Sequence, residues 1–200
     1  MRQRSIALLA LAALLVLVLV PAAPAAAAVT YTVDKSHSEV SFRIRHFVSK
    51  LRGQFRDFSA TIVKDDENPA ASSVEFTIQA TSIDTDHERR DADLRSSNFF
   101  DVEKFPTLTF KSTAIAKTGD DRYDVTGELT MHGVTKVMTL PVSFGGEMAD
   151  GRGGFRSAFE TSTTLDRKEF GLTWNRALDQ GGVMLGDEVE VVVNLAAIRE

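Results

Sequence analysis

Apolar and polar residues alternate with a period of two along most of the chain after residue 29. Between residues 40 and 45, Val40, Phe42 and Ile44 alternate with one serine and two arginines. The same alternation returns in residues 123–131 and 189–195. It predicts strands with one apolar face and one wet face, which is typical of antiparallel sheets. The pattern places strands at residues 30–34, 38–48, 53–64, 72–80, 107–116, 122–131, 135–144, 154–162 and 188–197.

Clusters of Gly, Asn and Asp separate the predicted strands. They occur at residues 65–69, 118–121, 132–133, 145–146 and 149–154, and these residue types supply the positive φ angles that tight turns require. Short connections join antiparallel strands into a meander, which either closes into a barrel or splits into a sandwich. We favour a barrel because closure removes the exposed edges of long amphipathic strands. The predicted fold is an all-β, eight-stranded antiparallel barrel.

The segment from Thr85 to Phe100 breaks this pattern and predicts a short, strongly charged helix. Leu94 is its only large apolar residue before the two phenylalanines at its end. Thr85 or Asp86 is the expected N-cap, and Glu88 follows Thr85 at the spacing of a capping box. One or two short helices of this kind between strands are expected to cover a mouth of the barrel.

The N-terminus predicts a targeting segment. Arg2 and Arg4 precede an apolar run from Ile6 to Val20, and Ala26-Ala27-Ala28 resembles a cleavage site. We therefore expect residues 1–28 to be a signal peptide and residues 29–200 to be one domain in the periplasm or secreted. An uncleaved membrane anchor is the competing interpretation, although the run is short for a span. Residues 29–200 contain no further apolar run long enough to cross a bilayer.

Charge and composition exclude several classes of function. The chain has 23 basic and 28 acidic residues and a net charge of −5, which argues against nucleic-acid binding. Cysteine is absent, so thiol catalysis, thioether-linked haem and cysteine-zinc sites are excluded. No His spacing typical of a metal site and no catalytic constellation occurs among the four histidines and the carboxylates. The sequence predicts a binding protein without a metal and not an enzyme.

The apolar face of the strands is rich in phenylalanine, of which the chain has 13. The interior of an eight-stranded barrel is just wide enough for side chains or one slender ligand. An apolar lumen suits a chain-like hydrocarbon, whereas the alternative is an ordinary filled core. Small residues on this face, such as Gly127 and Ser157, are expected to leave space in the lumen. His46 is in phase with Phe42 and Ile44 and points to the same face.

Two polar clusters contain arginine in a setting that suits a phosphate. They are Arg89-Arg90-Asp91 and Asp166-Arg167-Lys168. Because a guanidinium binds phosphate through two parallel hydrogen bonds, either cluster is a candidate for holding a lipid diphosphate head group. An ordinary surface or loop ion pair is the competing interpretation for both clusters.

Six segments together resemble the YceI-like family, the polyisoprenoid-binding proteins of bacteria. They keep their order and spacing from about residue 31 to 197, whereas each alone is weak. His132 departs from the family pattern as we know it, but it lies in a predicted turn. The segments are Val33–Ser38 with Phe42 and His46; Gly53-Gln54-Phe55; Ser82–Thr85 with Arg90, Asp91 and Leu94; Phe99–Asp101 leading to Phe105–Phe110; Gly127–Lys136; and Arg167–Leu172.

This resemblance implies an extended, lipocalin-like barrel whose apolar tunnel binds a long isoprenoid or similar amphiphilic lipid. It also implies a homodimer and a carrier, storage or stress-related role, with the bound lipid in place of any cofactor. A hydrolytic or redox protein that acts on such a lipid through polar mouth residues is the alternative. Arg90, Asp91 and Arg167 are the head-group candidates, and the loop carrying Trp174 is expected to border the mouth. The lumen candidates are Phe42, Ile44, His46, Phe76, Ile78, Phe110, Leu129, Met138, Leu140, Phe159 and Val191.

Overall fold

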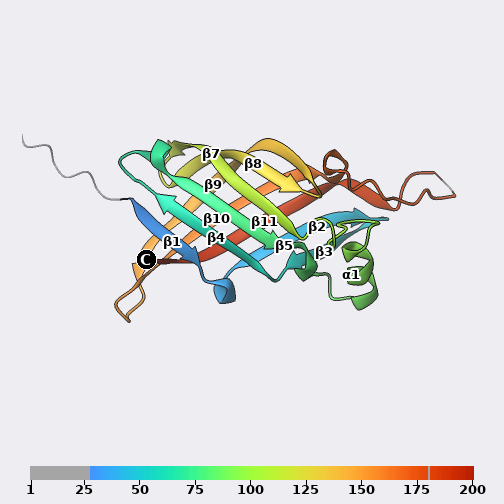
Figure 1. Ribbon diagram of the computed structural model, residues 1–200, viewed down its shortest axis with the longest axis horizontal. Coiled ribbons are helices and arrows are strands. Elements are labelled where there is room, and N and C mark those ends of the chain that lie inside the picture. Colours follow the sequence, from blue (N-terminus) through green and yellow to red (C-terminus); the bar gives the residue numbers. More distant parts are fainter. Residues whose placement is uncertain (1–27, 180) are drawn as a thin grey trace, which may run out of the picture.

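Eight antiparallel strands close into a barrel in the computed structural model, which describes residues 28–179 and 181–200 (Figure 1). The ring closes because the last strand pairs back onto the first, Val33 opposite Ala197. This arrangement confirms the predicted all-β, eight-stranded barrel. In ring order the strands are β1 (Val29–Val33), β4 (Phe58–Lys64), β5 (Ser73–Gln79), β7 (Thr107–Gly119), β8 (Arg122–Met131), β9 (Val134–Ala149), β10 (Phe155–Asp166) and β11 (Leu185–Arg199).

Two further strands extend the barrel at one end. β1 leads through the 3₁₀ turn η1 (Lys35–His37) into β2 (Glu39–His46), which returns as β3 (Ser49–Phe55). β11 is long enough to pair with β1 near Ala197 and with β2 from Leu185 to Asn194. The ring of strands is therefore complete at one end, which we call the ring end. At the other end, the mouth end, β2 and β3 project as a hairpin.

The prediction of a single strand at residues 53–64 is wrong. The strand breaks at Arg56-Asp57, where its partner changes from β2 to β1 and β5. The Arg56 N–H donates to the Ser82 carbonyl, and the Asp57 carbonyl accepts from Gln79. These two bonds fix the bend that separates the projecting hairpin from the ring.

The predicted turn at Gly145-Gly146 is also wrong, since both glycines lie inside β9. The register between β9 and β10 shifts between Ser157 and Phe159, and Gly146 has a φ of 82°. Glycine serves here to form a β-bulge, which requires the same backbone freedom as a turn. The chain reverses later, at residues 150–154. The Asp150 N–H donates to the Gly154 carbonyl and closes this turn.

The mouth end carries the charged helix α1 (Glu88–Arg95) (Figure 1). Its N-cap is His87, whose ring accepts from the Arg90 N–H, so the predicted cap at Thr85 or Asp86 is wrong. The Thr85 hydroxyl instead donates to Asp91. None of the helices in residues 28–179 and 181–200 is long and apolar enough to cross a membrane. The remaining short elements are η2 (Pro69–Ala71), η3 (Ala80–Ser82), β6 (Ile83–Asp84), which pairs with β3, and η4 (Arg167–Phe170).

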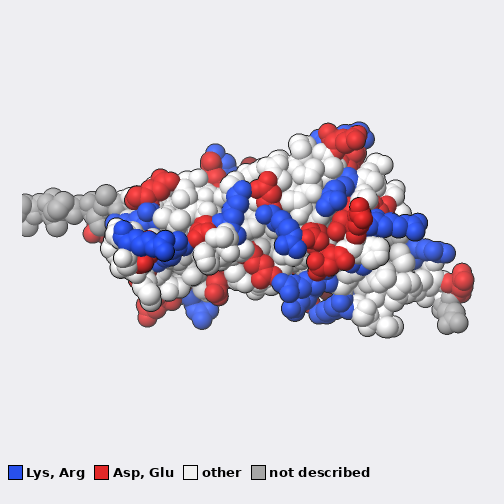
Figure 2. Space-filling view, turned by 90° about the horizontal axis from the view of Figure 1, so that it is seen from below, with Lys and Arg blue, Asp and Glu red and all other residues white. Residues whose placement is uncertain are grey.

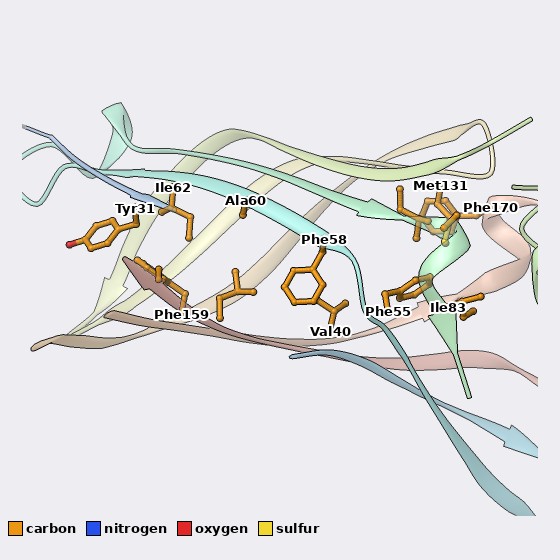
Figure 3. Close-up of a cluster of buried hydrophobic side chains, with 14 of the residues drawn as sticks. Tyr31, Val40, Phe55, Phe58, Ala60, Ile62, Ile83, Met131, Phe159 and Phe170 are labelled. Atoms are coloured by element: carbon orange, nitrogen blue, oxygen red, sulfur yellow. The ribbon is translucent and has the colours of Figure 1, made fainter. Parts of the chain in front are cut away.

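Inward-facing side chains form a core that runs along the barrel (Figure 3). At the ring end, the Tyr31 ring packs edge-on against Phe159 at 5.5 Å between centroids, and the Phe144 ring lies 5.2 Å from that of Phe159. The outer faces carry interspersed acidic and basic side chains (Figure 2), many of them in cross-strand pairs such as Lys111–Glu75. The strands thus have the apolar and wet faces that the alternation predicts.

Gly127 does not leave free lumen space as expected. A Cβ atom at this position would lie 2.5 Å from the Phe110 ring and 2.5 Å from the Lys111 carbonyl oxygen. The ring of Phe110 therefore occupies the volume that a side chain at residue 127 would need. The predicted signal peptide falls almost entirely on residues 1–27, outside the described residues.

Candidate functional site

An apolar cavity of about 730 Å³ occupies the mouth half of the barrel. Most of its wall is formed by the inward positions of the strands, because successive side chains of a strand point to opposite faces. Ten of the eleven lumen candidates line it, and they are Phe42, Ile44, His46, Phe76, Ile78, Phe110, Leu129, Met138, Leu140 and Val191. Most of these side chains are half-buried rather than buried, since they face the open cavity.

Phe159, the remaining lumen candidate, lines a second and smaller cavity of about 130 Å³ towards the ring end. Five residues contribute to the walls of both cavities and mark a waist between them. The waist residues are Phe76, Phe110, Leu140, Thr161 and Val193. A slender chain that enters the larger cavity therefore meets this waist before it reaches the ring end.

Few polar side chains face the interior. The Thr161 hydroxyl at the waist is buried and has no hydrogen-bond partner within the described part of the chain. Polar groups become frequent only where the cavity opens. His87, Arg89, Asp93 and Asn98 line the cavity and are exposed to solvent, so the cavity opens beside α1.

Aromatic and aliphatic residues from the segment after α1 and from the chain leading into β11 also border the opening. The Trp174 ring lies 5.1 Å from that of Phe99, and Met184 and Leu185 complete the wall. The loop with Trp174 thus borders the mouth. The predicted lumen set did not include Leu51, Phe99, Phe100, Leu165, Leu172, Trp174 or Met184, all of which line the cavity.

Arg90 and Asp91 have different surroundings. Arg90 lines the cavity, and its guanidinium donates to the hydroxyl and the carbonyl of Thr85, both at 2.6 Å. Asp91 is buried and accepts from the Thr85 N–H at 2.9 Å, and it is not part of the cavity wall. The Asp91 carboxylate therefore fixes the start of α1, and the remaining Arg90 donors lie at the cavity.

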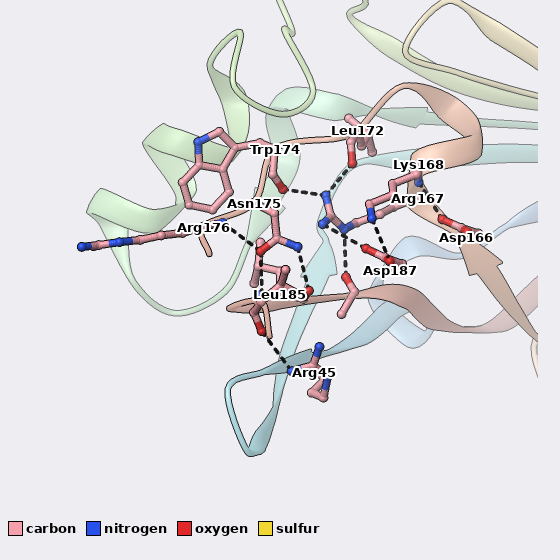
Figure 4. Close-up of polar contacts among 12 residues, drawn as sticks. Arg45, Asp166, Arg167, Lys168, Leu172, Trp174, Asn175, Arg176, Leu185 and Asp187 are labelled. Carbon is pink, nitrogen blue, oxygen red and sulfur yellow. Dashed lines mark hydrogen bonds and ion pairs between the residues drawn. The ribbon is translucent and has the colours of Figure 1, made fainter. Parts of the chain in front are cut away.

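The Arg167 guanidinium is embedded among backbone carbonyls below the mouth loop (Figure 4). Its side chain is only 4% exposed, and it donates to the carbonyls of Gly186 at 2.9 Å, Leu172 at 2.5 Å and Trp174 at 2.9 Å. Burial lowers its pKa, and the nearby Asp187 carboxylate opposes that shift. The guanidinium lines the cavity, but its described hydrogen bonds hold the segment from Leu172 to Gly186 in place.

Asp34, Ser36 and His37 lie together on the outer surface, away from the cavity wall. The same His37 nitrogen, Nδ1, is 3.0 Å from the Ser36 hydroxyl and 2.9 Å from Asp34. A proton relay from serine through histidine to aspartate needs both ring nitrogens, so this cluster lacks that geometry. Hydrogen bonds from Ser36, Arg156 and His37 lower the pKa of Asp34. Among the described residues, no three His, Asp or Glu side chains converge as metal ligands.

Known proteins are similar in sequence to this barrel. The sequence pattern of the YceI-like domain matches residues 31–197. A UPF0312 protein of Pseudomonas aeruginosa (strain LESB58) is 41% identical over 176 residues, which cover 86% of this chain and 88% of that protein. Protein YceI of Salmonella newport is 40% identical over 176 residues, with coverage of 86% and 88%.

Solved structures agree with this assignment. Burkholderia cenocepacia BcnA superposes with a TM-score of 0.73 at 28% identity, covering 82% of this chain and 98% of that one. A polyisoprenoid binding domain from Saccharophagus degradans superposes with a TM-score of 0.62 at 17% identity, covering 84% and 97%, and this likeness shows the fold alone. The chain belongs to the YceI-like family.

Proposed function

We propose that this protein binds a long apolar lipid, an isoprenoid or a similar amphiphile, in the cavity of the barrel. The observation that carries the proposal is the cavity itself, about 730 Å³ of space behind an almost wholly apolar wall. This volume lies within the range of about 300–1,000 Å³ that is usual for small-molecule sites. The name of the Saccharophagus degradans relative, a polyisoprenoid binding domain, supports the same ligand class.

The distribution of polar groups supports one orientation of the lipid. Its hydrocarbon chain would lie between the mouth and the waist, against Phe42, Met138 and their neighbours. Each five-carbon isoprene unit that leaves water contributes about 4 kcal/mol before the entropy cost of ordering. The polar head group would stay at the mouth, where Arg89 and Arg90 lie in the wall.

Three further features of the proposal come from the sequence. The N-terminal segment supports export to the periplasm or outside the cell, where the protein would carry or store its lipid. A homodimer remains a prediction from the family resemblance. The absence of a nucleophile-base pair in the sequence pattern supports binding over catalysis, with bound lipid and no metal or other cofactor.

Neighbouring positions on β9 provide a matched test of the cavity. Met138 lines the lumen, whereas Val137 points outward and is exposed. Native mass spectrometry of the protein produced by export, followed by fragmentation of any released mass, reports the ligand. We expect a retained mass that fragments in isoprene steps. The Met138→Trp variant should lose it or retain a shorter chain, whereas Val137→Trp should retain the wild-type mass.

The opposite result is equally clear. An apo mass that stays unchanged after incubation with polyprenyl phosphates, isoprenoid quinones and fatty amides would remove the proposed function. Equal loss of ligand in the Val137→Trp control would show that the substitution on β9, rather than occupation of the lumen, causes the effect.

A further inference from the structure

Three exposed apolar side chains lie together beside the mouth of the cavity. Phe47 and Val48 form the turn between β2 and β3, where Phe47 is 43% exposed and Val48 is fully exposed. Val183 is 37% exposed in the loop that precedes β11. We call these three residues the apolar tip.

Hydrogen bonds join the two segments of the apolar tip. The Phe47 N–H donates to the Met184 carbonyl at 2.8 Å. The Arg45 guanidinium donates to the carbonyls of Phe47 at 2.9 Å and Val183 at 3.3 Å. The apolar tip is therefore one surface, and it stands on a defined scaffold.

The backbone of Phe47 is in a conformation that a bulky residue rarely adopts. His46 pairs with Ser49 across a two-residue turn, and Phe47 has a φ of 53° at the first turn position. Glycine is preferred where a tight hairpin turn needs positive φ, and phenylalanine there is strained. Because the Phe47 ring is largely exposed and contacts the His46 ring edge-on at 4.7 Å, core packing does not account for a phenylalanine at this position.

Basic residues surround the apolar tip, although the whole chain has a net charge of −5. Between Glu39 and Phe55 there are four basic residues and one acidic residue, and two of the four, Lys50 and Arg52, pair with Glu190 and Glu39. Arg43 lies opposite Glu190 across the pairing of β2 with β11, whereas Arg45 and Arg176 form no ion pair with a carboxylate within residues 28–179 and 181–200. Figure 2 shows Lys and Arg side chains, and one acidic group beyond them, projecting at the end of the molecule to which the β2–β3 hairpin points in Figure 1.

We propose that the apolar tip docks the protein on an anionic lipid membrane. Apolar side chains that enter the acyl boundary, together with basic residues at the head groups, are the two signals that hold a peripheral protein at such a surface. Aromatic side chains are favoured at this boundary. His46, Met184 and Leu185 adjoin the apolar tip and line the cavity, so docking places the mouth at the membrane surface. That the docked state loads the cavity rests on the proposed function; docking itself does not.

A vesicle flotation assay tests the docking. Residues 28–200 contain every strand of the closed barrel, and their use removes the apolar run from Ile6 to Val20. We expect this protein to float with vesicles of phosphatidylglycerol and phosphatidylcholine. Binding should fall at high salt and be weak on phosphatidylcholine alone, because surface charge is screened.

The Phe47→Gly/Val48→Ser double variant separates docking from folding. It keeps the Phe47 N–H donor and relieves the positive-φ strain, so its Tm should equal or exceed that of the wild type. Its binding to the anionic vesicles should fall about tenfold or more. The matched control is Val137→Ser, which removes an exposed valine from the barrel wall and should bind like the wild type. Arg43→Gln/Arg176→Gln should reduce binding about tenfold on anionic vesicles.

The proposal is overturned if the wild type does not float with anionic vesicles or if the double variant binds as the wild type does. Sedimentation velocity tests the alternative that a second copy of this chain binds the apolar tip. A wild type that self-associates through Phe47 and Val48 without binding vesicles would also overturn it. Native mass spectrometry of the same samples keeps the two proposals apart, because vesicle binding by a protein that retains no lipid would leave docking intact and remove the carrier function.

Discussion

The two ends of the barrel are held together by different interactions. At the ring end, paired strands surround the interior, and the rings of Tyr31 and Phe144 each pack against that of Phe159. At the mouth end, hydrogen bonds from side chains to backbone carbonyls replace the hydrogen bonds between paired strands. Arg167 holds Leu172, Trp174 and Gly186, and Arg95 holds Thr81 and Ile83.

This difference shows how a barrel can stay open. A strand ladder satisfies backbone groups by closing the sheet, which would also close the mouth. An arginine reaches several carbonyls from one position, so it satisfies them where the strands diverge. The ring end therefore depends on apolar packing, and the mouth end depends on buried polar side chains.

The largest expected effect is at the ring end. Phe159→Ala removes a buried ring that packs on both Tyr31 and Phe144. We expect a loss of about 3–5 kcal/mol in the free energy of unfolding, as is usual for such truncations. Urea unfolding of the wild type and the variant measures it. A loss below about 1 kcal/mol would mean that packing does not hold this end.

The mouth end should lose stability when a buried polar side chain is replaced by an apolar one. Arg167→Met keeps the length of the side chain but leaves several carbonyls without their donor, and we expect a loss of about 2–3 kcal/mol. Hydrogen exchange should quicken first in the loop between Leu172 and Leu185. The control is Lys168→Met, since the exposed Lys168–Asp187 pair contributes about 0–1 kcal/mol. Equal losses of unfolding free energy in both variants would contradict the conclusion that the buried Arg167 side chain stabilises the mouth end.

A smaller effect with a defined pH dependence is expected at Asp34, between β1 and η1. The Asp34 carboxylate binds Arg156 on β10 and the residues of η1, and these contacts lower its pKa. Such a group stabilises the fold above its unfolded pKa of about 3.9 and loses that contribution as the pH falls through its folded pKa. Asp34→Asn should therefore cost about 1–2 kcal/mol at neutral pH.

The pH dependence provides the check on Asp34. The difference in Tm between wild type and Asp34→Asn should shrink progressively below about pH 4. A constant difference from neutral to acid pH would assign the effect to the amide substitution itself rather than to the ionised carboxylate.

The smallest effect is expected in the open lumen. Met138 lines the cavity and is packed on one side only, so Met138→Ala should cost less than about 1.5 kcal/mol, below the usual range for a fully packed methionine. Chemical unfolding of the ligand-free protein measures this cost. A value as large as that of Phe159→Ala would show that Met138 belongs to a filled core.

Most of the barrel could be predicted because its strands alternate strictly. The phase of β9 places Met138 and Leu140 inside and Val137 outside, as the structure has them. The bend at Arg56-Asp57 carries no glycine or proline that would mark it. Gly146 needs positive φ in a bulge as it would in a turn, so the residue type does not distinguish them.

The mouth was harder to predict from the sequence. Phe99 and Phe100 lie in a segment without periodicity, so nothing local places them at the cavity, and the loop with Trp174 was expected at the mouth only from the family resemblance. Histidine is not among the residues preferred at an N-cap, so the sequence pattern did not indicate that α1 begins after His87. The alternating sequence pattern of a strand is also the same whether its apolar face lines a filled core or an open lumen. What separates the two is how side chains of neighbouring strands fit together, such as the Phe110 ring on β7 over Gly127 on β8.

The position of β11 has a consequence for the order in which the protein can fold. β11 is the last strand described, yet it provides an edge for β10, β1 and β2. Until residues 185–199 have been synthesised, the chain can form only an open sheet in which β1 and β10 each have one paired edge and one free edge. Closure is then a contact between β1 and β11, which lie far apart in the sequence, and such contacts form slowly. A nascent or newly exported chain would spend that interval with its apolar interior exposed, which makes it a natural client for a holding chaperone.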